Sequence, residues 1–357
     1  MDATLPPSAA EHLPPWAAEH LPPWAAEAVD AAQVAGTDVA AGLALAEQYG
    51  ELLPPPGEGR TWARWSVLAA IAERELTAAR ILEAHSDALA ILHEAGEAHP
   101  KGTWGVFAAE SPTARLQATE AASAVSLTGT KPWCSLAGSI DHALVTAHVG
   151  RGRRLYAVDL DSPTVTVDPP ERWVARGLAT VTSGQVHFAD TPGRPIGGLG
   201  WYLDRPGFAW GGIGVAACWY GGACGLYRSL RERCSAQAGE LAALHVGIVD
   251  AALHGAGATL EHAAGLVDAG LAIGDAGQLL ALRVRAVVAD AVERTVRQVG
   301  HALGPAPLAF DERHARRVAD LELYVRQHHA ERDLASLGAA GIGAAGIDTT
   351  VSRTGHS

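Results

Sequence analysis

Three stretches of the sequence carry side chains of the kinds that bind cofactors, ligate metals or move protons. Lys131-Pro-Trp-Cys-Ser135 places an indole, a thiol and a hydroxyl at the end of an apolar, strand-like segment. Gly212-Ile-Gly-Val-Ala-Ala217 fits the G-x-G-x-x-A pattern of dinucleotide-binding loops. His328 and His329 form an imidazole pair. These side chains suit, in turn, a flat aromatic ligand, a pyrophosphate, and a metal ion or proton.

The second and third patterns lack the context that their chemistry needs. A dinucleotide loop follows a strand, but here residues 206–210 precede the glycines and a helical pattern follows, which indicates close helix packing instead. The sixteen histidines include no H-x-x-x-H or H-E-x-x-H spacing, and His328 and His329 point to different faces of one predicted helix. No G-x-S-x-G sequence occurs. We therefore expect no metal site and no hydrolase triad.

Composition excludes other classes of protein. The 357 residues carry a net charge of −12, and the densest basic run, residues 151–154, falls at a predicted hairpin turn, so we expect no nucleic-acid binding. The four cysteines match neither a disulfide scaffold nor a C-x-x-C metal site. The first residues lack a signal-peptide pattern, and no window reaches about 18 uninterrupted apolar residues. We expect a cytoplasmic protein without a membrane segment.

The chain divides into five parts. Residues 1–24 form a Pro-rich arm with the octamer AAEHLPPW repeated in tandem, to which we assign no role. Residues 25–103 have helical spacing, interrupted at Pro54-Pro-Pro-Gly57. Residues 104–200 change to short alternating segments with frequent turns, which predicts an antiparallel sheet or barrel. Residues 201–338 are helical again, and residues 339–357 form a Gly-rich tail.

The predicted strands and the predicted C-terminal helices follow from these periods. The strands are expected at residues 115–119, 122–127, 142–148, 154–160, 164–167 and 185–188. Four long helices are expected at residues 213–234, 240–269, 274–303 and 313–337, with short Gly-bearing links typical of an up-down bundle. A mainly α chain with a central β-domain results.

Four local matches, in this order along the chain, give the sequence its resemblance to a known family. They are Phe107-Ala-Ala-Glu110, Leu127 to Ser135, Gly177 to Asp190, and Gln298 to Gly304. With the order helical, β, helical, the chain resembles the acyl-CoA dehydrogenase family. The resemblance implies an N-terminal helical domain, a β-barrel, and a C-terminal four-helix bundle that mediates oligomerisation as a dimer or tetramer.

The resemblance also implies an FAD cofactor and the residues that would bind it. An isoalloxazine ring needs an apolar slot with backbone polar groups along one edge. Main-chain groups of Phe107, Ala108 and Ala109 would bond the ring, Trp133 would cover one face, and Ser135 would donate a hydroxyl. Two further residues correspond to the family's Gln-x-x-Gly-Gly turn, Gln298 and His301. Arg115 would contact the phosphates of an acyl-CoA or other thioester substrate.

The reaction that the family implies is dehydrogenation of an acyl thioester, with the electrons passed on to an electron-transfer partner. It requires a base beside the flavin. The usual glutamate falls at Gln327 or His328, the alternative location at residues 208–213 holds no acid, and the pyrophosphate arginine falls on Ser235. We expect His328 on the inward stripe of the last helix, oriented by Glu331 one turn later.

Two alternatives stay open at this stage. Flavin monooxygenases of the same fold also place a histidine in this helix, which would give oxygen activation instead of dehydrogenation. A catalytically degenerate subunit in a heteromer would also account for the missing arginine and glutamate.

Overall fold

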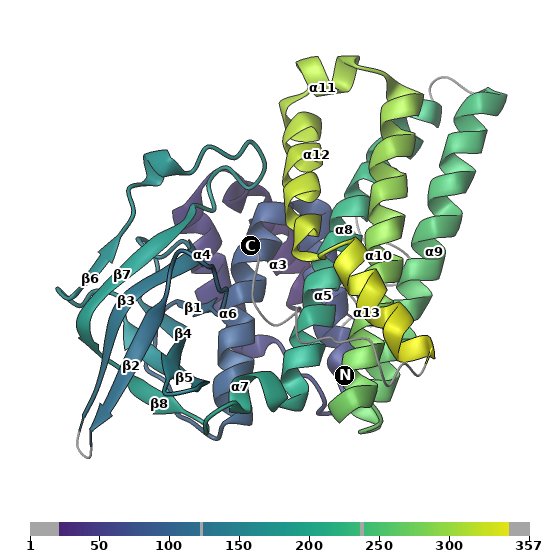
Figure 1. Cartoon of the computed structure of the whole chain (residues 1–357). Helices are drawn as coiled ribbons and strands as arrows, with labels where there is room; N and C mark the ends of the chain where they lie inside the picture. The colour runs from purple at the N-terminus through teal and green to yellow at the C-terminus, as the bar shows by residue number, and fades with distance from the viewer. Residues whose placement is uncertain (1–20, 122–123, 236–238, 343–357) are drawn as a thin grey trace.

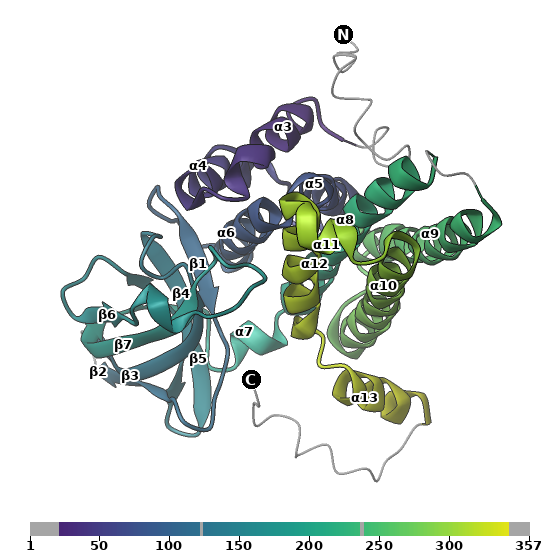
Figure 2. The same ribbon diagram turned by 90° about the horizontal axis from the view of Figure 1, so that it is seen from above.

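The computed structural model describes residues 21–121, 124–235 and 239–342. Most of the octamer repeat and most of the tail lie outside these residues. Figure 1 shows a β-sheet on one side, a helical bundle on the other, and the N-terminal helices between them. Seen from above, helix α6 lies directly beside the sheet, and α9 lies at the edge farthest from it (Figure 2). The predicted order of a helical region, a sheet and a second helical region is therefore confirmed.

The N-terminal region contributes the central layer of the molecule. Its helices are α3 (Ala25–Ala35), α4 (Val39–Tyr49), η1 (Gly50–Leu52), α5 (Thr61–Arg74) and α6 (Leu76–Glu94). Helix α4 begins where the carboxylate of Asp38 accepts hydrogen bonds from the amides of Ala40 and Ala41. Helices α5 and α6 are buried on nearly all faces, so the charged side chains on them must find partners inside the protein.

The sheet contains eight strands in the part of the chain that is described. They are β1 (Trp104–Phe107), β2 (Leu116–Ala121), β3 (Ala124–Ser135), β4 (His142–Val149), β5 (Gly152–Asp159), β6 (Val165–Val167), β7 (Ser183–Pro192) and β8 (Arg194–Ile196). The order is β6-β7-β3-β2-β4-β5-β8, with β1 paired to β4. Strands β1 and β2 each run parallel to β4, so the prediction of a purely antiparallel sheet was wrong. Alternation of apolar and polar residues indicates that a segment is a strand, but it does not indicate whether the neighbouring strand runs parallel or antiparallel to it.

Strand β3 lies between β2 and β7 in the sheet. Its pairing with β7 shifts register at two points. Gly129 lies at one shift with a φ of 123°. A Cβ atom there would come within 2.2 Å of the Arg115 carbonyl oxygen, which accepts a hydrogen bond from the Thr130 amide. Only glycine fits this contact.

The C-terminal region forms the bundle and its extensions. Its elements are α7 (Trp201–Asp204), α8 (Pro206–Ser235), α9 (Glu240–Asp268), α10 (Gly274–Leu303), α11 (Ala306–Phe310), α12 (Glu312–Tyr324), η3 (Val325–Gln327) and α13 (Glu331–Ile342). Residues 212–217 lie inside α8, as the helix-packing interpretation requires. At Gly221, a Cβ atom would lie 2.0 Å from the Ala69 carbonyl oxygen, so small residues let α8 approach α5 closely.

The last predicted helix is two helices. The prediction of one continuous helix over residues 313–337 was wrong, because α12 ends at Tyr324 and α13 begins only at Glu331. His328 between them has extended backbone, and Ala330 has a φ of 45°. The Arg285 guanidinium donates to the Gln327 carbonyl oxygen at 2.6 Å, which satisfies a helix-end acceptor at the break. Helical periodicity continues through the sequence here, but periodicity carries no information on a contact with another helix.

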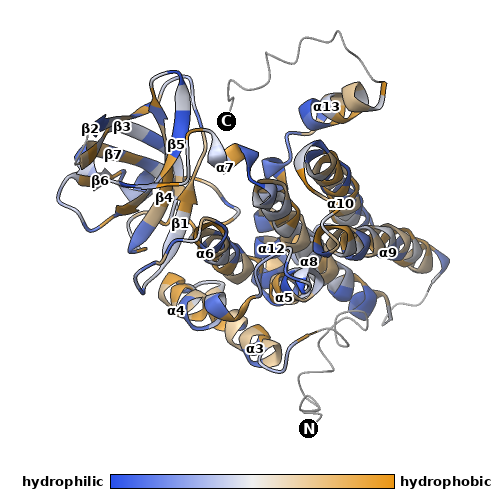
Figure 3. Cartoon of the chain, turned by 90° about the horizontal axis from the view of Figure 1, so that it is seen from below, coloured by the Kyte–Doolittle hydropathy of each residue, from blue (hydrophilic) through white to orange (hydrophobic). Residues whose placement is uncertain are grey.

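Helix α9 combines high hydrophobicity with exposure. Helix α9 is long and apolar enough to cross a membrane, judged by length and composition alone, although a helix of a soluble bundle can pass the same test. In this structure, 17% of its most apolar window is buried. It packs against α10 and α8 and exposes Leu241 and Leu244. Figure 3 shows apolar residues along much of its length at the edge of the bundle.

Candidate active site

The corner at the end of β3 presents an aromatic ring to solvent. The pairing of β3 with β7 shifts register between Lys131 and Cys134, and Trp133 within this shift has a φ of 58°. Its indole is 49% exposed and meets Trp173 edge to face, with ring centroids 6.3 Å apart. A bulky residue in the left-handed region is strained, and such residues concentrate at ligand sites. Trp133 is therefore available to cover a bound ring.

Two hydroxyls and a guanidinium meet beside this corner. The Oγ atoms of Ser135 and Ser183 lie 2.9 Å apart, at the paired ends of β3 and β7. Ser135 Oγ also accepts a hydrogen bond from the Arg80 guanidinium at 3.2 Å, and Arg80 belongs to α6. The predicted ligand Ser135 thus lies where the sheet meets the helical layer, and it has polar partners on both sides.

A buried ion pair joins two of the sequence motifs inside the sheet. Lys131 Nζ lies 2.7 Å from Glu110 Oε1 and 2.8 Å from Thr146 Oγ1, and the Lys131 side chain is 2% exposed. His148 Nε2 lies 3.0 Å from the other Glu110 oxygen. Burial would raise the pKa of Glu110, but the charge and hydrogen bond of Lys131 lower it overall. The ion pair fixes the segment that follows β1 against β3.

The segment Phe107 to Ala109 lies at the start of this fixed region. Phe107 ends β1, aligns with Val145 of β4, and is 1% exposed, so its ring belongs to the core. Ala108 and Ala109 follow the strand, and Ala109 is exposed. Any contact of these residues with a ligand would use the main chain, as the family resemblance implies.

Helix α6 directs a set of charged side chains into the interior. Arg80 Nη1 lies 3.1 Å from Glu83 Oε2, and the phenol of Tyr324 donates to the same oxygen at 3.2 Å. The Arg80 guanidinium also lies 5.6 Å from the centre of the Tyr324 ring. Burial raises the pKa of Glu83, against the charge of Arg80. Ser135, Arg80, Glu83 and Tyr324 therefore form one polar network from β3 to α12.

Asp87 lies one helical turn beyond Glu83, near the charges of Arg205 and Arg64. Among the described residues, it makes no hydrogen bond or ion pair. Burial raises its pKa, an effect that the charges of Arg205 and Arg64 oppose. A Cβ atom at Gly211 of α8 would lie 2.8 Å from Asp87 Oδ1, so glycine leaves room for this carboxylate. A half-buried carboxylate without a hydrogen bond, and with a raised pKa, is suited to acid-base work.

Asp320 fastens the β-domain to the bundle. Its Oδ1 accepts a hydrogen bond from the Leu178 amide at 2.5 Å, and its Oδ2 accepts one from Thr77 Oγ1 at 3.3 Å. Leu178 has a φ of 47°, and a Cβ atom at Gly177 would lie 1.9 Å from the Ala319 carbonyl oxygen. Burial raises the pKa of Asp320 to about 6. One carboxylate thus holds a loop of the sheet against both α12 and α6.

His328 is buried in the break between α12 and α13. It is 8% exposed, and its Nε2 atom is buried without a hydrogen-bond partner among the described residues. The nearest carboxylate is Asp333, with an oxygen 3.9 Å from Nε2. Burial lowers the pKa of His328, so the imidazole is neutral near neutral pH. Glu331, which we expected to orient His328, is exposed at the start of α13. The carboxylate closest to His328 is that of Asp333 instead.

Arg285 of α10 connects the histidine to the α6 network. Its guanidinium donates to the Gly212 carbonyl oxygen at 2.8 Å as well as to Gln327, and it stacks 4.7 Å from the centre of the Trp219 ring. Burial lowers the pKa of Arg285, while the charges of Asp333, Tyr324 and Glu83 raise it. Arg285 therefore interacts with both the group around His328 and the Tyr324-Glu83 pair.

Three predicted ligands lie away from this assembly. Gln298 Oε1 is 2.7 Å from His245 Nδ1, and the ring of His301 meets His245 edge to face at 6.2 Å. Both belong to the contact between α10 and α9, on the side of the bundle away from the sheet (Figure 2). Arg115 is exposed just before β2. Any role of these residues at the β3 corner would require another subunit or a long ligand.

The sequence reasoning missed Arg80, Glu83, Asp87 and Arg285. The first three recur every three to four residues in a helix that is otherwise apolar, so they share one face. That spacing was a usable signal, because charges on a buried helix need partners or a function. Arg285 carried no such signal. The described residues contain no group of three or more His, Cys, Asp or Glu placed to hold a metal ion.

The sequence matches no protein-family profile, and a search of curated proteins finds no relative. Solved structures do match. TdsC from Paenibacillus sp. A11-2 with FMN and indole has a TM-score of 0.76 at 17% identity, covering 89% of this chain and 96% of that one. A nitrososynthase from Micromonospora carbonacea var. africana has a TM-score of 0.70 at 18% identity, covering 96% and 99%.

Glutaryl-CoA dehydrogenase from Mycobacterium smegmatis is similar to the same extent. Its TM-score is 0.73 at 16% identity, covering 90% of this chain and 95% of that one. KijD3 with FMN and a dTDP-sugar has a TM-score of 0.70 at 18% identity, covering 96% and 95%. The chain therefore has the fold of the acyl-CoA dehydrogenase superfamily, which these proteins share.

Proposed function

From a fold shared with flavin-dependent enzymes, we propose that this chain is a flavin-dependent oxidoreductase and, within that class, a flavin monooxygenase. TdsC is described as a dibenzothiophene monooxygenase, and both TdsC and KijD3 were solved with FMN. The observation that carries the choice is His328. This buried, neutral imidazole, whose Nε2 has no hydrogen-bond partner among the described residues, occupies the turn where the family resemblance expects a glutamate.

The residues at the β3 corner fit a flavin. Trp133 offers a half-exposed ring in a strained conformation, and Ser135 and Ser183 offer hydroxyls beside it. A bound flavin supplies redox chemistry, and its reduced form reacts with oxygen. FMN is the nucleotide bound in the TdsC and KijD3 structures, whereas the family resemblance alone pointed to FAD. FMN and FAD have the same isoalloxazine ring and differ only in the rest of the molecule. The ring is the part that the β3 corner would hold.

The chain's own residues would then bind and orient the flavin ring and transfer protons. Trp133 would cover one face of the ring, and Ser135 would donate a hydrogen bond that Arg80 polarises. His328 would hold or deliver a proton at Nε2, while Asp333 raises the pKa of the imidazole and Arg285 lowers it. Burial of Glu83, Tyr324 and His328 would exclude water from this side.

Dehydrogenation of an acyl thioester is the second candidate, and Asp87 favours it. This half-buried carboxylate with a raised pKa could replace the missing glutamate as a base. Arg115 would remain the proposed partner of the substrate phosphates, and an electron-transfer partner would be needed. We also propose a cytoplasmic oligomer, with the exposed apolar residues of α9 as support for an interface in the bundle. A degenerate subunit of a heteromer is the third reading.

One purified sample separates these functions. We expect a yellow protein after addition of FMN or FAD, with oxygen uptake when NADH and a flavin reductase supply electrons. Bleaching of the flavin by a panel of acyl-CoA thioesters, without oxygen uptake, would replace the monooxygenase by the dehydrogenase. A protein that stays colourless with either nucleotide would overturn both.

A further inference from the structure

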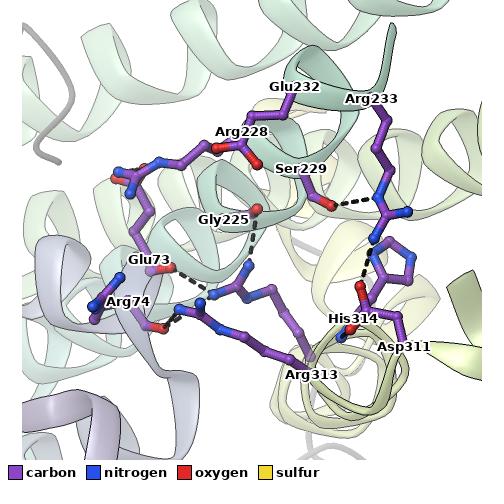
Figure 4. Close-up of a pocket in the computed structure, with 11 residues that line it drawn as sticks. Glu73, Arg74, Gly225, Arg228, Ser229, Glu232, Arg233, Asp311, Arg313 and His314 are labelled. Carbon is purple, nitrogen blue, oxygen red and sulfur yellow. Dashed lines mark hydrogen bonds and ion pairs between the residues drawn. The ribbon is translucent and has the colours of Figure 1, made fainter. Parts of the chain in front are cut away.

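A pocket lined by arginines lies at the end of the bundle, apart from the corner that holds Trp133. It has a volume of about 510 Å³ and is formed by the end of α5, the second half of α8 and the start of α12. Figure 4 shows the side chains converging on it from these three helices. Its arginines are Arg74, Arg228, Arg233, Arg313 and Arg317. Pockets of this size hold small molecules.

Two of the arginines are held in place by backbone carbonyls. Arg317 donates to the carbonyl oxygens of Glu73, Arg74 and Gly225, each at 3.0 Å, and Arg313 donates to that of Arg74 at 3.1 Å. These contacts satisfy the last acceptors of α5 without neutralising either guanidinium. The positive charges of Arg313 and Arg317 are therefore positioned by backbone contacts.

The acidic residues of the pocket balance only part of this charge. Arg228 pairs with Glu73, and Arg233 pairs with Asp311 at 2.5 Å. Glu232 is the third acid in the lining, so three carboxylates face five arginines. Burial also raises the pKa of Glu73 to about 7, which weakens its negative charge near neutral pH. The pocket carries a positive excess in a protein whose net charge is −12.

The arginines repel one another where they are partly buried. Burial, together with the charge of Arg313, lowers the pKa of Arg317 to about 10. The pKa of Arg74 is lowered by burial and then by Arg313. The Nε atom of Arg74 is buried without a hydrogen-bond partner among the described residues. An anion in the pocket would relieve this repulsion.

An independent observation comes from His314. This residue lines the pocket, is 6% exposed, and leaves its Nδ1 atom buried without a partner in the described part of the chain. Buried polar atoms without partners are uncommon in folded proteins, and a bound ligand is one way to satisfy them. His314 thus offers a hydrogen-bonding atom, on a side chain more than nine-tenths buried, in the lining of a positively charged cavity.

We propose that this pocket binds the phosphate group of a phosphorylated small molecule, with Arg74, Arg313 and Arg317 supplying charge and His314 a further hydrogen bond. Guanidinium groups match phosphate oxygens in shape and charge, and several of them together favour a multiply charged anion over a single carboxylate. This binding site goes beyond the proposed redox function, because none of its residues contacts the β3 corner in the described structure.

The experiment is calorimetric titration of the full chain with inorganic pyrophosphate. We expect binding to one site, weakening as salt is raised, and at least about tenfold weaker in Arg313→Glu. Arg294→Glu, which makes the same charge change at an exposed ion pair on α10, should bind as the wild type does. Absence of binding, or equal binding by all three proteins, would overturn the proposal.

A second measurement covers the case in which Arg313→Glu alters the fold. The ring of His314 should titrate at higher pH when pyrophosphate is bound, because the anion opposes the effect of the arginines. Nuclear magnetic resonance of the imidazole would show this shift in the wild type, and an unchanged His314 titration at saturating pyrophosphate would contradict the proposal.

The source of the phosphate follows from competition with flavin nucleotides. Displacement of pyrophosphate by FMN but not by riboflavin would identify the phosphate end of a flavin nucleotide as the ligand. Simultaneous binding of FMN and pyrophosphate would identify a separate phosphorylated molecule, for which ADP is the next probe. Failure of pyrophosphate binding would leave the flavin spectrum unaffected, so the two proposals can fail separately.

Discussion

The phenol of Tyr324 donates a hydrogen bond to Glu83 Oε2 at 3.2 Å and joins α12 to α6 inside the protein. Both side chains are buried, and Arg80 extends the contact to Ser135 at the end of β3. One polar network therefore connects the helical layer, the bundle and the sheet. The geometry of the β3 corner depends on it, because Ser135 is held from the helical side by Arg80.

Replacing Tyr324 with Phe should destabilise the protein by about 1–3 kcal/mol, because a buried carboxylate loses a donor. Chemical denaturation measures the change. The control is Tyr227→Phe, which removes a hydrogen bond to Asp250 at the surface and should cost less. In a double-mutant cycle with Glu83→Gln, we expect the double variant's loss in free energy of unfolding to differ from the sum of the two single losses. Strict additivity would mean that the pair is not coupled.

Trp133→Gly should reduce flavin affinity about tenfold while leaving stability unchanged or slightly higher. The indole is half exposed, so little core packing is lost, and glycine accepts a φ of 58° without strain. Loss of one aromatic face costs on the order of 1 kcal/mol. Quenching of flavin fluorescence measures the affinity. Unaltered flavin binding by this variant would remove Trp133 from the site.

Gly177→Ala should loosen the contact between the β-domain and α12. The new Cβ atom would meet the Ala319 carbonyl oxygen at 1.9 Å, so the loop must move and the Leu178–Asp320 hydrogen bond must lengthen. We expect a loss of about 2 kcal/mol or more. Gly138→Ala, whose nearest neighbour lies at 3.9 Å, is the matched control. Thermal unfolding of the two variants should differ clearly.

Asp320 should make stability fall as pH rises through the acidic range. Its pKa in the folded protein is about 6, above the ordinary 3.8, so the folded state holds the proton more tightly than the unfolded state. The wild type should lose up to roughly 3 kcal/mol relative to Asp320→Asn between pH 4 and pH 7. Denaturation curves at several pH values test this, and a constant difference between the proteins would contradict it.

His328 should set the acidic limb of the activity profile. Its pKa lies below the ordinary value because of burial, so the neutral imidazole persists down to mildly acidic pH and activity falls as the ring is protonated. His328→Gln should lower turnover at least tenfold and remove that limb. His262→Gln, at an exposed histidine on α9, serves as the control. Turnover and pH dependence like those of the wild type in His328→Gln would exclude a role in proton transfer.

The sequence by itself determined the order of the helical and β regions and the position of the turn at the end of β3. Changes of period from helical spacing to alternation and back are local properties, so they located the sheet and the bundle correctly. The Lys-Pro-Trp-Cys-Ser run marked the corner, because an exposed turn with an indole and a hydroxyl is also a local feature. Glu110 and Lys131 were both within quoted motifs, although nothing in the sequence paired them.

Only the tertiary structure decided which side chains meet at the corner and where the last helix ends. Arg80 and Ser135 are 55 residues apart in the sequence, and Glu83 and Tyr324 are 241 residues apart. Periodicity carries no information about contacts between residues so far apart. At the break between α12 and α13, Arg285 from another helix donates to the Gln327 carbonyl oxygen, a contact that no local pattern predicts. The parallel pairing of β1 with β4 follows from the chain's path through the sheet. Local pattern fixes an element's type, whereas its partners follow from the packing of the whole chain.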